Sequence, residues 1–238
     1  MRKSPASAFT LLEMLTVLAI IVILAGLVLS VGGYVQRKGA LARASGEIAM
    51  LSSACDSYKA DNGSYPYPQR DSSTRTLSDA ISPKSNFSPI DPTYAPASLF
   101  LYKQLTGDLT TNGQAGTPPD GIPDDGVPRY LKEFDPRILN ATKDPTTKAI
   151  TQVNYFQDPF GFPYAYSTSA AYDEWKWQYM LLRNPSAANT LIRPTGNQLT
   201  GFNSGSFDLW STGGSNPTRN PATPDTMGLE WAKWVKNW

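Results

Sequence analysis

The chain has 238 residues, a net charge of +1 and no histidine. The lack of histidine excludes Ser-His-Asp and Cys-His nucleophilic catalysis and every histidine-dependent metal site. The nearly neutral charge gives no electrostatic reason to expect nucleic acid as a partner. Because histidine is absent, an enzyme built on this sequence would depend on carboxylates, lysine or tyrosine. The one cysteine, Cys55, permits no internal disulfide.

The N-terminal region contains a stretch that is long and apolar enough to cross a bilayer. Residues 14–35 are uncharged and mostly apolar, and a helix of this length spans a hydrocarbon core of about 30 Å. Arg2 and Lys3 precede the stretch and favour a cytoplasmic N-terminus, while Arg37 and Lys38 on the far side oppose that preference. A cleaved secretory signal and a simple membrane anchor are the alternatives, although the apolar region of a secretory signal is usually shorter.

Glu13 is the only charged residue between Ser7 and Ser30. A carboxylate inside hydrocarbon is costly and indicates a function with a partner. A short basic leader, a small residue, "FTLLE" and an apolar helix together resemble the class III signal of type IV pilins and type II secretion pseudopilins. The alternative to a functional role is that Glu13 is an acidic residue near the membrane interface without a specific function.

The resemblance implies specific processing and assembly roles. A prepilin peptidase would cut between Ala8 and Phe9 and methylate the new amine of Phe9. The family usually has glycine just before the cut, where this chain has Ala8. Glu13 becomes the fifth mature residue, and in the family this glutamate reaches the amine of a neighbouring subunit. Two charges that are costly alone become tolerable when paired, so the pair favours assembly.

The helix is expected to continue past the membrane, over residues 36–62. An apolar stripe recurs at helical spacing, with Arg43, Glu47 and Lys59 outside it; it consists of Leu41, Ala44, Ile48, Leu51, Cys55 and Tyr58. Glycines at 26, 32, 33 and 39 predict a weakened stretch between the two parts of the helix. "YKADNGSYPYP" then ends the helix, because Asn62-Gly63 forms a stop and two prolines follow it.

Residues 69–150 are less regular and look like an insertion relative to shorter secretion pseudopilins. Residues 96–107 predict a short helix with Leu99, Tyr102 and Leu105 facing inward. Residues 118–128 place three aspartates, Asp120, Asp124 and Asp125, among glycines and prolines. Such a loop is either a solvated turn or a calcium site without the spacing of an EF-hand.

The C-terminal part carries further stretches similar to the major pseudopilin of type II secretion. "DPFGFPYAYS" at 158–167 predicts turns around a short strand, "SFDLWSTGG" at 206–214 predicts the next strand, and the chain closes with "NW". In that family the loop after the last strand binds calcium. Here Ser211 and Asp225 are the candidate ligands, and a loop held by prolines and glycines is the alternative.

Two aromatic patterns remain near the C-terminus. If this stretch is extended, Trp175 and Trp177 share one face of a strand, as a stacking platform for carbohydrate requires; ordinary core or subunit-contact packing is the favoured interpretation. "LEWAKWVKNW" at 229–238 predicts a short amphipathic helix with Trp231, Trp234 and Val235 on its apolar side.

The expected fold is therefore α+β, a long N-terminal helix packed on a small antiparallel sheet with a loop-rich insertion. The expected parts are a leader (1–8), an assembly helix in the membrane (9–35), its amphipathic continuation (36–62) and a periplasmic globular region (63–238). By resemblance the chain is a structural subunit of a type II secretion pseudopilus and not an enzyme. Its expected partners are the prepilin peptidase, identical and related subunits, an inner-membrane platform with its ATPase, and the bilayer.

Two alternatives remain open at this point. Within the same class, the chain is a type IV pilus or competence-type minor pilin. From a different class, it is a membrane-anchored ectodomain that binds carbohydrate or hydrolyses a substrate with carboxylates.

Overall fold

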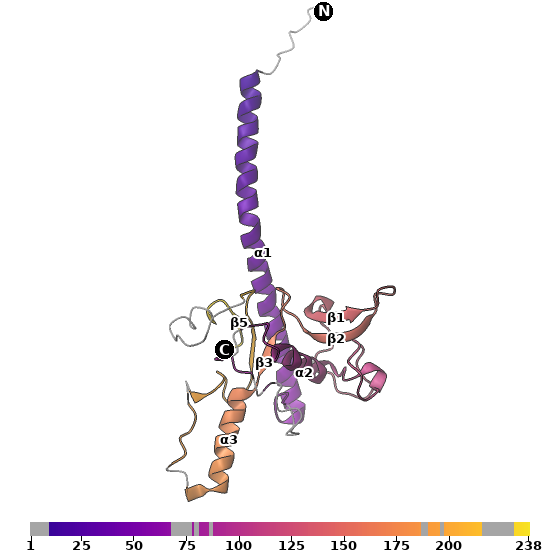
Figure 1. Ribbon diagram of the computed structural model, residues 1–238, viewed down its shortest axis with the longest axis vertical. Coiled ribbons are helices and arrows are strands. Elements are labelled where there is room, and N and C mark those ends of the chain that lie inside the picture. Colours follow the sequence, from indigo (N-terminus) through magenta and orange to yellow (C-terminus); the bar gives the residue numbers. More distant parts are fainter. Residues whose placement is uncertain are drawn as a thin grey trace, which may run out of the picture. The chain divides into compact units, whose positions relative to one another are not determined.

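A computed structural model describes residues 10–67, 78, 81–85, 88–186, 190–195, 198–215 and 231–238 (Figure 1). It confirms the α+β class, with a long helix, two shorter helices and two small antiparallel sheets. The chain divides into two units between Ala42 and Arg43. The first unit holds the N-terminal part of the long helix, and the second holds everything that forms a core.

Helix α1 covers Leu11–Asn62 and is continuous over the four glycines that predicted a weakened stretch. It ends where the sequence predicted. Gly63 has a φ of 75°, and its N–H donates to the carbonyl oxygen of Lys59 at 2.8 Å. This left-handed C-cap is readily adopted by glycine because glycine has no Cβ.

The core of the second unit forms on the predicted stripe of α1. Ala44, Ile48, Leu51 and Cys55 are buried, and three of them join a cluster with residues of α2 and of both sheets. Cys55 is completely buried, as a small apolar side chain would be. The placement of Glu47 outside the buried face was wrong, since this residue is also buried.

Helix α2 (Tyr94–Thr106) confirms the helix predicted at 96–107. Tyr102 and Leu105 are buried as expected, whereas Leu99 is only partly buried against the edge of the core. The helix ends at Gly107 in the left-handed region, with a φ of 73°. A Cβ at this position would lie 3.0 Å from the carbonyl oxygen of Pro128. Both the positive φ and this close approach favour glycine.

The first sheet is a hairpin of β1 (Leu139–Lys143) and β2 (Ile150–Phe156). Two short 3-10 helices, η1 (Thr111–Gly113) and η2 (Pro136–Ile138), lie between α2 and β1. Val153 and Phe156 of β2 are fully buried and face the core cluster. The region expected as an insertion thus contributes a helix and one strand of the hairpin, in addition to loops.

The second sheet has the order β3-β4-β5, with β3 at Ala165–Ser167, β4 at Asp208–Ser211 and β5 at Val235–Lys236. All neighbours are antiparallel. The strands predicted within 158–167 and 206–214 are confirmed. The hydroxyl of Tyr166 in β3 donates to the carbonyl oxygen of Pro66 at 2.5 Å and so links the sheet to the segment after α1.

The helix predicted at 229–238 was wrong from residue 232 onward. Trp231 is helical, residues 232–234 form a turn, and Val235–Lys236 pairs with β4. The indole rings of Trp234 and Trp210 stack with centroids 5.9 Å apart, and the amide of Asn237 accepts the N–H of Leu209 at 2.9 Å. Strand pairing and the packing of two tryptophans outweigh the helical spacing of the apolar residues.

Trp175 and Trp177 do not lie on a strand, which was the condition for a carbohydrate platform. These residues belong to helix α3 (Ser169–Arg183), in which Tyr172, Trp175 and Tyr179 stack in sequence with ring centroids 5.9 and 5.2 Å apart. The faces of these rings contact one another. They do not form the flat, shared platform that a sugar ring requires.

Candidate functional site

The N-terminus of α1 is built by Thr10 and Glu13. The backbone N–H and the hydroxyl of Thr10 donate to Oε2 of Glu13 at 2.9 and 2.8 Å, and the N–H of Glu13 donates back to Oγ1 of Thr10 at 3.2 Å. This reciprocal pattern is a capping box, which satisfies two N–H groups that a helix start leaves without intrahelical partners. In the single chain, therefore, the carboxylate of Glu13 is held locally and exposed.

Ala8 and Phe9, the residues of the expected cleavage, lie outside the described residues. Their predicted roles, and the predicted pairing of Glu13 with the amine of Phe9, stay predictions. The capping box contains Thr10, which becomes the second mature residue if the cut falls where the sequence predicts. The carboxylate thus already lies at the end of the helix that would carry the new amine.

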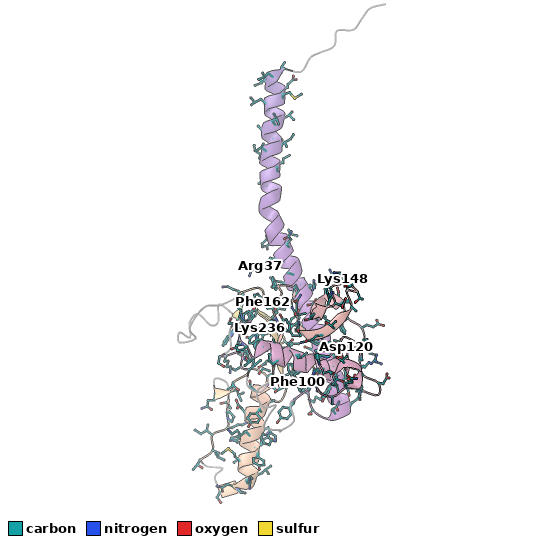
Figure 2. The ribbon with its side chains drawn as sticks, turned by 45° about the vertical axis from the view of Figure 1, so that its right-hand side comes forward. Arg37, Phe100, Asp120, Lys148, Phe162 and Lys236 are labelled. Atoms are coloured by element: carbon teal, nitrogen blue, oxygen red, sulfur yellow. The ribbon has the colours of Figure 1, made fainter. Side chains whose placement is uncertain are left out.

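The first part of α1 carries exposed apolar side chains, which project on both sides of the helix in Figure 2. Every large apolar residue from Leu11 to Leu27 is more than half exposed, between 51% and 82%, so no side of this part is covered. A helix that is apolar on all sides requires a membrane or a protein environment. Among the described residues α1 is the one helix that is long and apolar enough to cross a membrane.

A buried charge fixes α1 against the second sheet. Glu47 is 9% exposed; its Oε1 accepts Nε of Arg43 at 2.7 Å, and its Oε2 accepts the hydroxyl of Tyr164 at 2.5 Å. Burial is the main cause that raises the pKa of Tyr164 above its usual value of 10.0, and the hydrogen bond to the Glu47 carboxylate raises it further. The Tyr164 hydroxyl therefore remains a donor. Pairing on both oxygens makes the buried carboxylate tolerable and specifies one position for the helix.

Asp158 ties the turn before β3 to strand β4. Its Oδ1 accepts the N–H groups of Phe160 and Phe162, both at 2.9 Å, and its Oδ2 accepts the hydroxyl of Ser211 at 2.5 Å. Burial raises the pKa of Asp158 above its usual value of 3.8. Sequence reasoning missed this role, although Asp followed by Pro and a Gly-containing turn is a common signal for a carboxylate that accepts backbone N–H groups.

The candidate calcium ligands are not brought together in the described part of the chain. Ser211 is buried, and its oxygen is shared between Asp158 and the N–H of Gly213. Asp225 lies outside the described residues. Ser211 alone does not fit calcium, which prefers six to eight oxygen ligands that include carboxylates.

Two of the three carboxylates in the acidic loop at 118–128 accept backbone N–H groups. Asp124 accepts N–H groups of Leu109, Thr110 and Gly113, and Asp120 accepts the N–H of Ile122. No group of three or more acidic or cysteine side chains that would suit a metal occurs among the described residues. The geometry here supports a structural loop, labelled at Asp120 in Figure 2.

We therefore expect calcium removal to leave the protein unchanged. A bound ion present at a hundred times its dissociation constant would contribute about 2.7 kcal/mol, which corresponds to several degrees for a protein of this size. Thermal unfolding of the full chain in detergent, followed by tryptophan fluorescence with and without chelator, measures this contribution. A decrease of several degrees with chelator would show that a calcium site exists and that this expectation is wrong.

Replacement of Asp158 should give a stability effect that depends on pH. Asp158→Ala leaves two partly buried N–H groups and the buried Ser211 hydroxyl without their acceptor, at up to about 1–3 kcal/mol each, whereas Asp158→Asn keeps one oxygen for the N–H groups. A raised folded pKa means that the folded state binds the proton more tightly, so the contribution of Asp158 to stability falls as pH rises from 3.8 through the raised value. Asn does not titrate, so the stability of Asp158→Asn relative to wild type should increase over that range. Unfolding curves at several pH values test this, and a constant difference would contradict it.

Comparison with known proteins gives one match. Residues 3–29 match the prokaryotic N-terminal methylation motif. Neither the curated proteins nor the solved structures contain a match to this chain. The motif indicates a type IV pilin-like protein of the prepilin type, and with the apolar helix it indicates a single-pass membrane anchor.

Proposed function

We propose that this chain is a structural subunit of a type II secretion pseudopilus, which helps to drive folded proteins across the outer membrane. The main support for the proposal is that several features occur in the same segment. The methylation motif at residues 3–29 overlaps the first part of α1, which is apolar on all sides and contains a single acid, Glu13, next to the expected new N-terminus. A surface of this kind suits packing against the same helix of other subunits, after extraction from the bilayer.

The secretion system is favoured by the places that the resembling stretches occupy. "YKADNGSYPYP" forms the end of α1, "DPFGFPYAYS" leads into β3, "SFDLWSTGG" contains β4, and the terminal Asn237-Trp238 directly follows β5. They lie at the helix end and along one three-stranded sheet. Residues 69–150 are an insertion in this proposal, and α2 and strand β1 of the hairpin are its contributions to the fold.

Assembly depends on a change of partner for Glu13. In the single subunit the carboxylate accepts from Thr10. After cleavage between Ala8 and Phe9, the freed amine of a neighbouring Phe9 is mostly cationic at neutral pH, since its ordinary pKa is about 7.7–8.0. The paired charges enter the apolar filament interior together, and neither remains unpaired there.

The topology and partners follow from this role. The leader 1–8 faces the cytoplasm, the assembly helix 9–35 crosses the inner membrane, and residues 36–238 lie in the periplasm. The prepilin peptidase processes the chain, and the assembly platform with its ATPase adds the subunit to a polymer of identical and related pseudopilins. The chain itself performs no catalysis, and its expected modification is methylation of Phe9.

Deletion of the gene with complementation tests the choice of system. We expect the deletion to retain normally secreted folded proteins in the periplasm and the intact gene to restore their export. Normal export with a loss of surface pili or of DNA uptake would instead assign the chain to a type IV pilus or competence system. Normal behaviour in all three assays would favour an anchored ectodomain that works outside any filament.

A further inference from the structure

Helix α3 and the returning residues 190–193 form an arm, called the α3 arm below. The guanidinium of Arg193 contacts Glu174, with Nη2 to Oε1 at 2.6 Å and Nε to Oε2 at 3.1 Å, and it lies 5.5 Å from the centroid of the Trp177 ring. The Trp177 indole N–H also donates to the carbonyl oxygen of Leu191 at 3.5 Å. The returning segment is therefore fastened along one side of α3.

The opposite side of α3 carries a stripe of apolar side chains. Tyr172, Trp175, Tyr179 and Leu182 follow one another at spacings of three and four, which places them on one face of a helix. Trp175 and Tyr179 are 37% and 40% exposed, and Leu182 is 81% exposed. The stacked rings make this face rigid, because each ring limits the rotation of the next.

Exposed apolar residues are concentrated on this arm. Beyond Val35, and within the described residues, seven large hydrophobic side chains are exposed, and five of them belong to the α3 arm. They are Trp175, Tyr179, Met180, Leu182 and Ile192; the other two are Ile90 and Ile122. A soluble surface usually scatters such residues singly, and a concentration of them marks an interaction surface.

We infer that the α3 arm is a contact between the globular region of one subunit and a second copy of this chain in the assembly. The inference rests on the proposed function, because only assembly places a second copy beside the arm. It adds a contact to the assembly that α1 would provide, because the periplasmic regions would also touch through α3.

The size of the exposed surface argues for a partner that is already held nearby. The three exposed residues of the stripe, Trp175, Tyr179 and Leu182, add up to less than two whole side chains, roughly 320 Å² if a fully exposed large side chain counts for about 200 Å². An independent complex needs about 800 Å² from each partner. A smaller patch is sufficient when another contact holds the two molecules together at a high effective concentration, as neighbours in a filament are held.

The charges on the arm also suit a second copy better than an anionic membrane. The arm carries two acidic residues, Asp173 and Glu174, and three basic ones, Lys176, Arg183 and Arg193, so both signs occur in nearly equal number. A lipid surface would be matched by a clearly basic face. The whole chain has a net charge of only +1, so copies of it do not repel each other strongly.

Photo-crosslinking of the full chain in cells with the assembly machinery tests this inference. A benzophenone amino acid replaces Leu182 or Ile192 on the arm, and in matched controls it replaces Ile122 or Ile90, which are exposed to a similar degree, at 62% and 65%. We expect a several-fold excess of covalent dimer of this chain at the arm positions. Glu13→Ala should abolish that excess, since it prevents assembly.

A probe at Ile20 in the apolar part of α1 separates this inference from the proposed function. Dimers from Ile20 without an excess at Leu182 and Ile192 would refute the arm contact and leave the assembly of α1 in place. An excess at the arm that persists in Glu13→Ala, or adducts with lipid or another protein, would also refute it. Loss of dimers at all three positions would contradict both proposals.

Discussion

Glu13→Ala should prevent filament formation while the protein still inserts into the membrane and is still cleaved. Neither the apolar span nor the cleavage site requires the charge, and removal of a carboxylate eases insertion. In the filament, the amine of Phe9 would then be buried without a counter-charge, at a cost of about 3–5 kcal/mol. This cost corresponds to subunit association that is weaker by roughly a hundredfold or more.

Glu13→Gln separates the charge from the helix cap. A glutamine at this position still completes a capping box with Thr10, so the helix start is preserved. If the charge is the essential feature, Glu13→Gln should fail to assemble as completely as Glu13→Ala. Glu13→Asp should be intermediate, since the charge remains on a shorter side chain.

Crosslinking of neighbouring subunits in membranes, with an immunoblot for cleavage beside it, measures both outcomes. If Glu13→Gln assembles as well as wild type and Glu13→Ala does not, the residue acts through the cap alone. If Glu13→Ala also forms filaments normally, Glu13 has no assembly role.

Replacement of Ala8 by a bulky residue, as in Ala8→Trp, should leave nearly all of the protein as uncleaved precursor in the inner membrane. The family that this leader resembles has a small residue before the cut, so a large side chain there should exclude the scissile bond from the peptidase. Ala8→Gly is the matched control and should be cleaved at least as completely as wild type. Gel mobility of pulse-labelled protein measures the cleaved fraction.

A strain without the prepilin peptidase completes this experiment. The wild-type chain should accumulate there as full-length precursor, with the same mobility as Ala8→Trp. Normal maturation in that strain would mean that another protease acts on the chain, and the proposed class would be wrong.

The parts of the fold that sequence predicted correctly depend on strong local signals. Asn62-Gly63 followed by prolines ends α1 whatever surrounds it, because glycine adopts the left-handed cap and proline cannot continue a helix. Strands β3 and β4 are short aromatic runs between turn residues, and the stripe on α1 repeats over several helical turns.

The differences from the sequence analysis have two causes, which are distant contacts at the C-terminus and an ambiguous local pattern around Trp175. The C-terminal residues have helical spacing, but pairing with β4 and the stack of Trp234 on Trp210 hold them as a turn and strand. Around Trp175 and Trp177 the spacing fitted a strand as well as a helix, and the stacking of Trp175 between Tyr172 and Tyr179 accompanies the helix.

The buried network around Glu47 could not be derived from the chain alone. Arg43 and Glu47 are four residues apart and read as an ordinary exposed helix pair. Only the fold brings the hydroxyl of Tyr164, more than a hundred residues away, to the second carboxylate oxygen. The capping box of Thr10 and Glu13 is different, because the sequence "TLLE" has the spacing of a capping box and could have predicted it.

The central claim, that this chain is a processed pilin-like subunit, is tested most directly by the mass of the N-terminal peptide of the mature protein. The account predicts a chain that begins at Phe9 with a methyl group on its amine and retains Glu13 as its fifth residue. A mature chain that begins after the apolar part of α1 would identify a secreted protein with a cleaved signal. A chain that keeps residues 1–8 and lacks methylation in cells with an active peptidase would contradict the account equally.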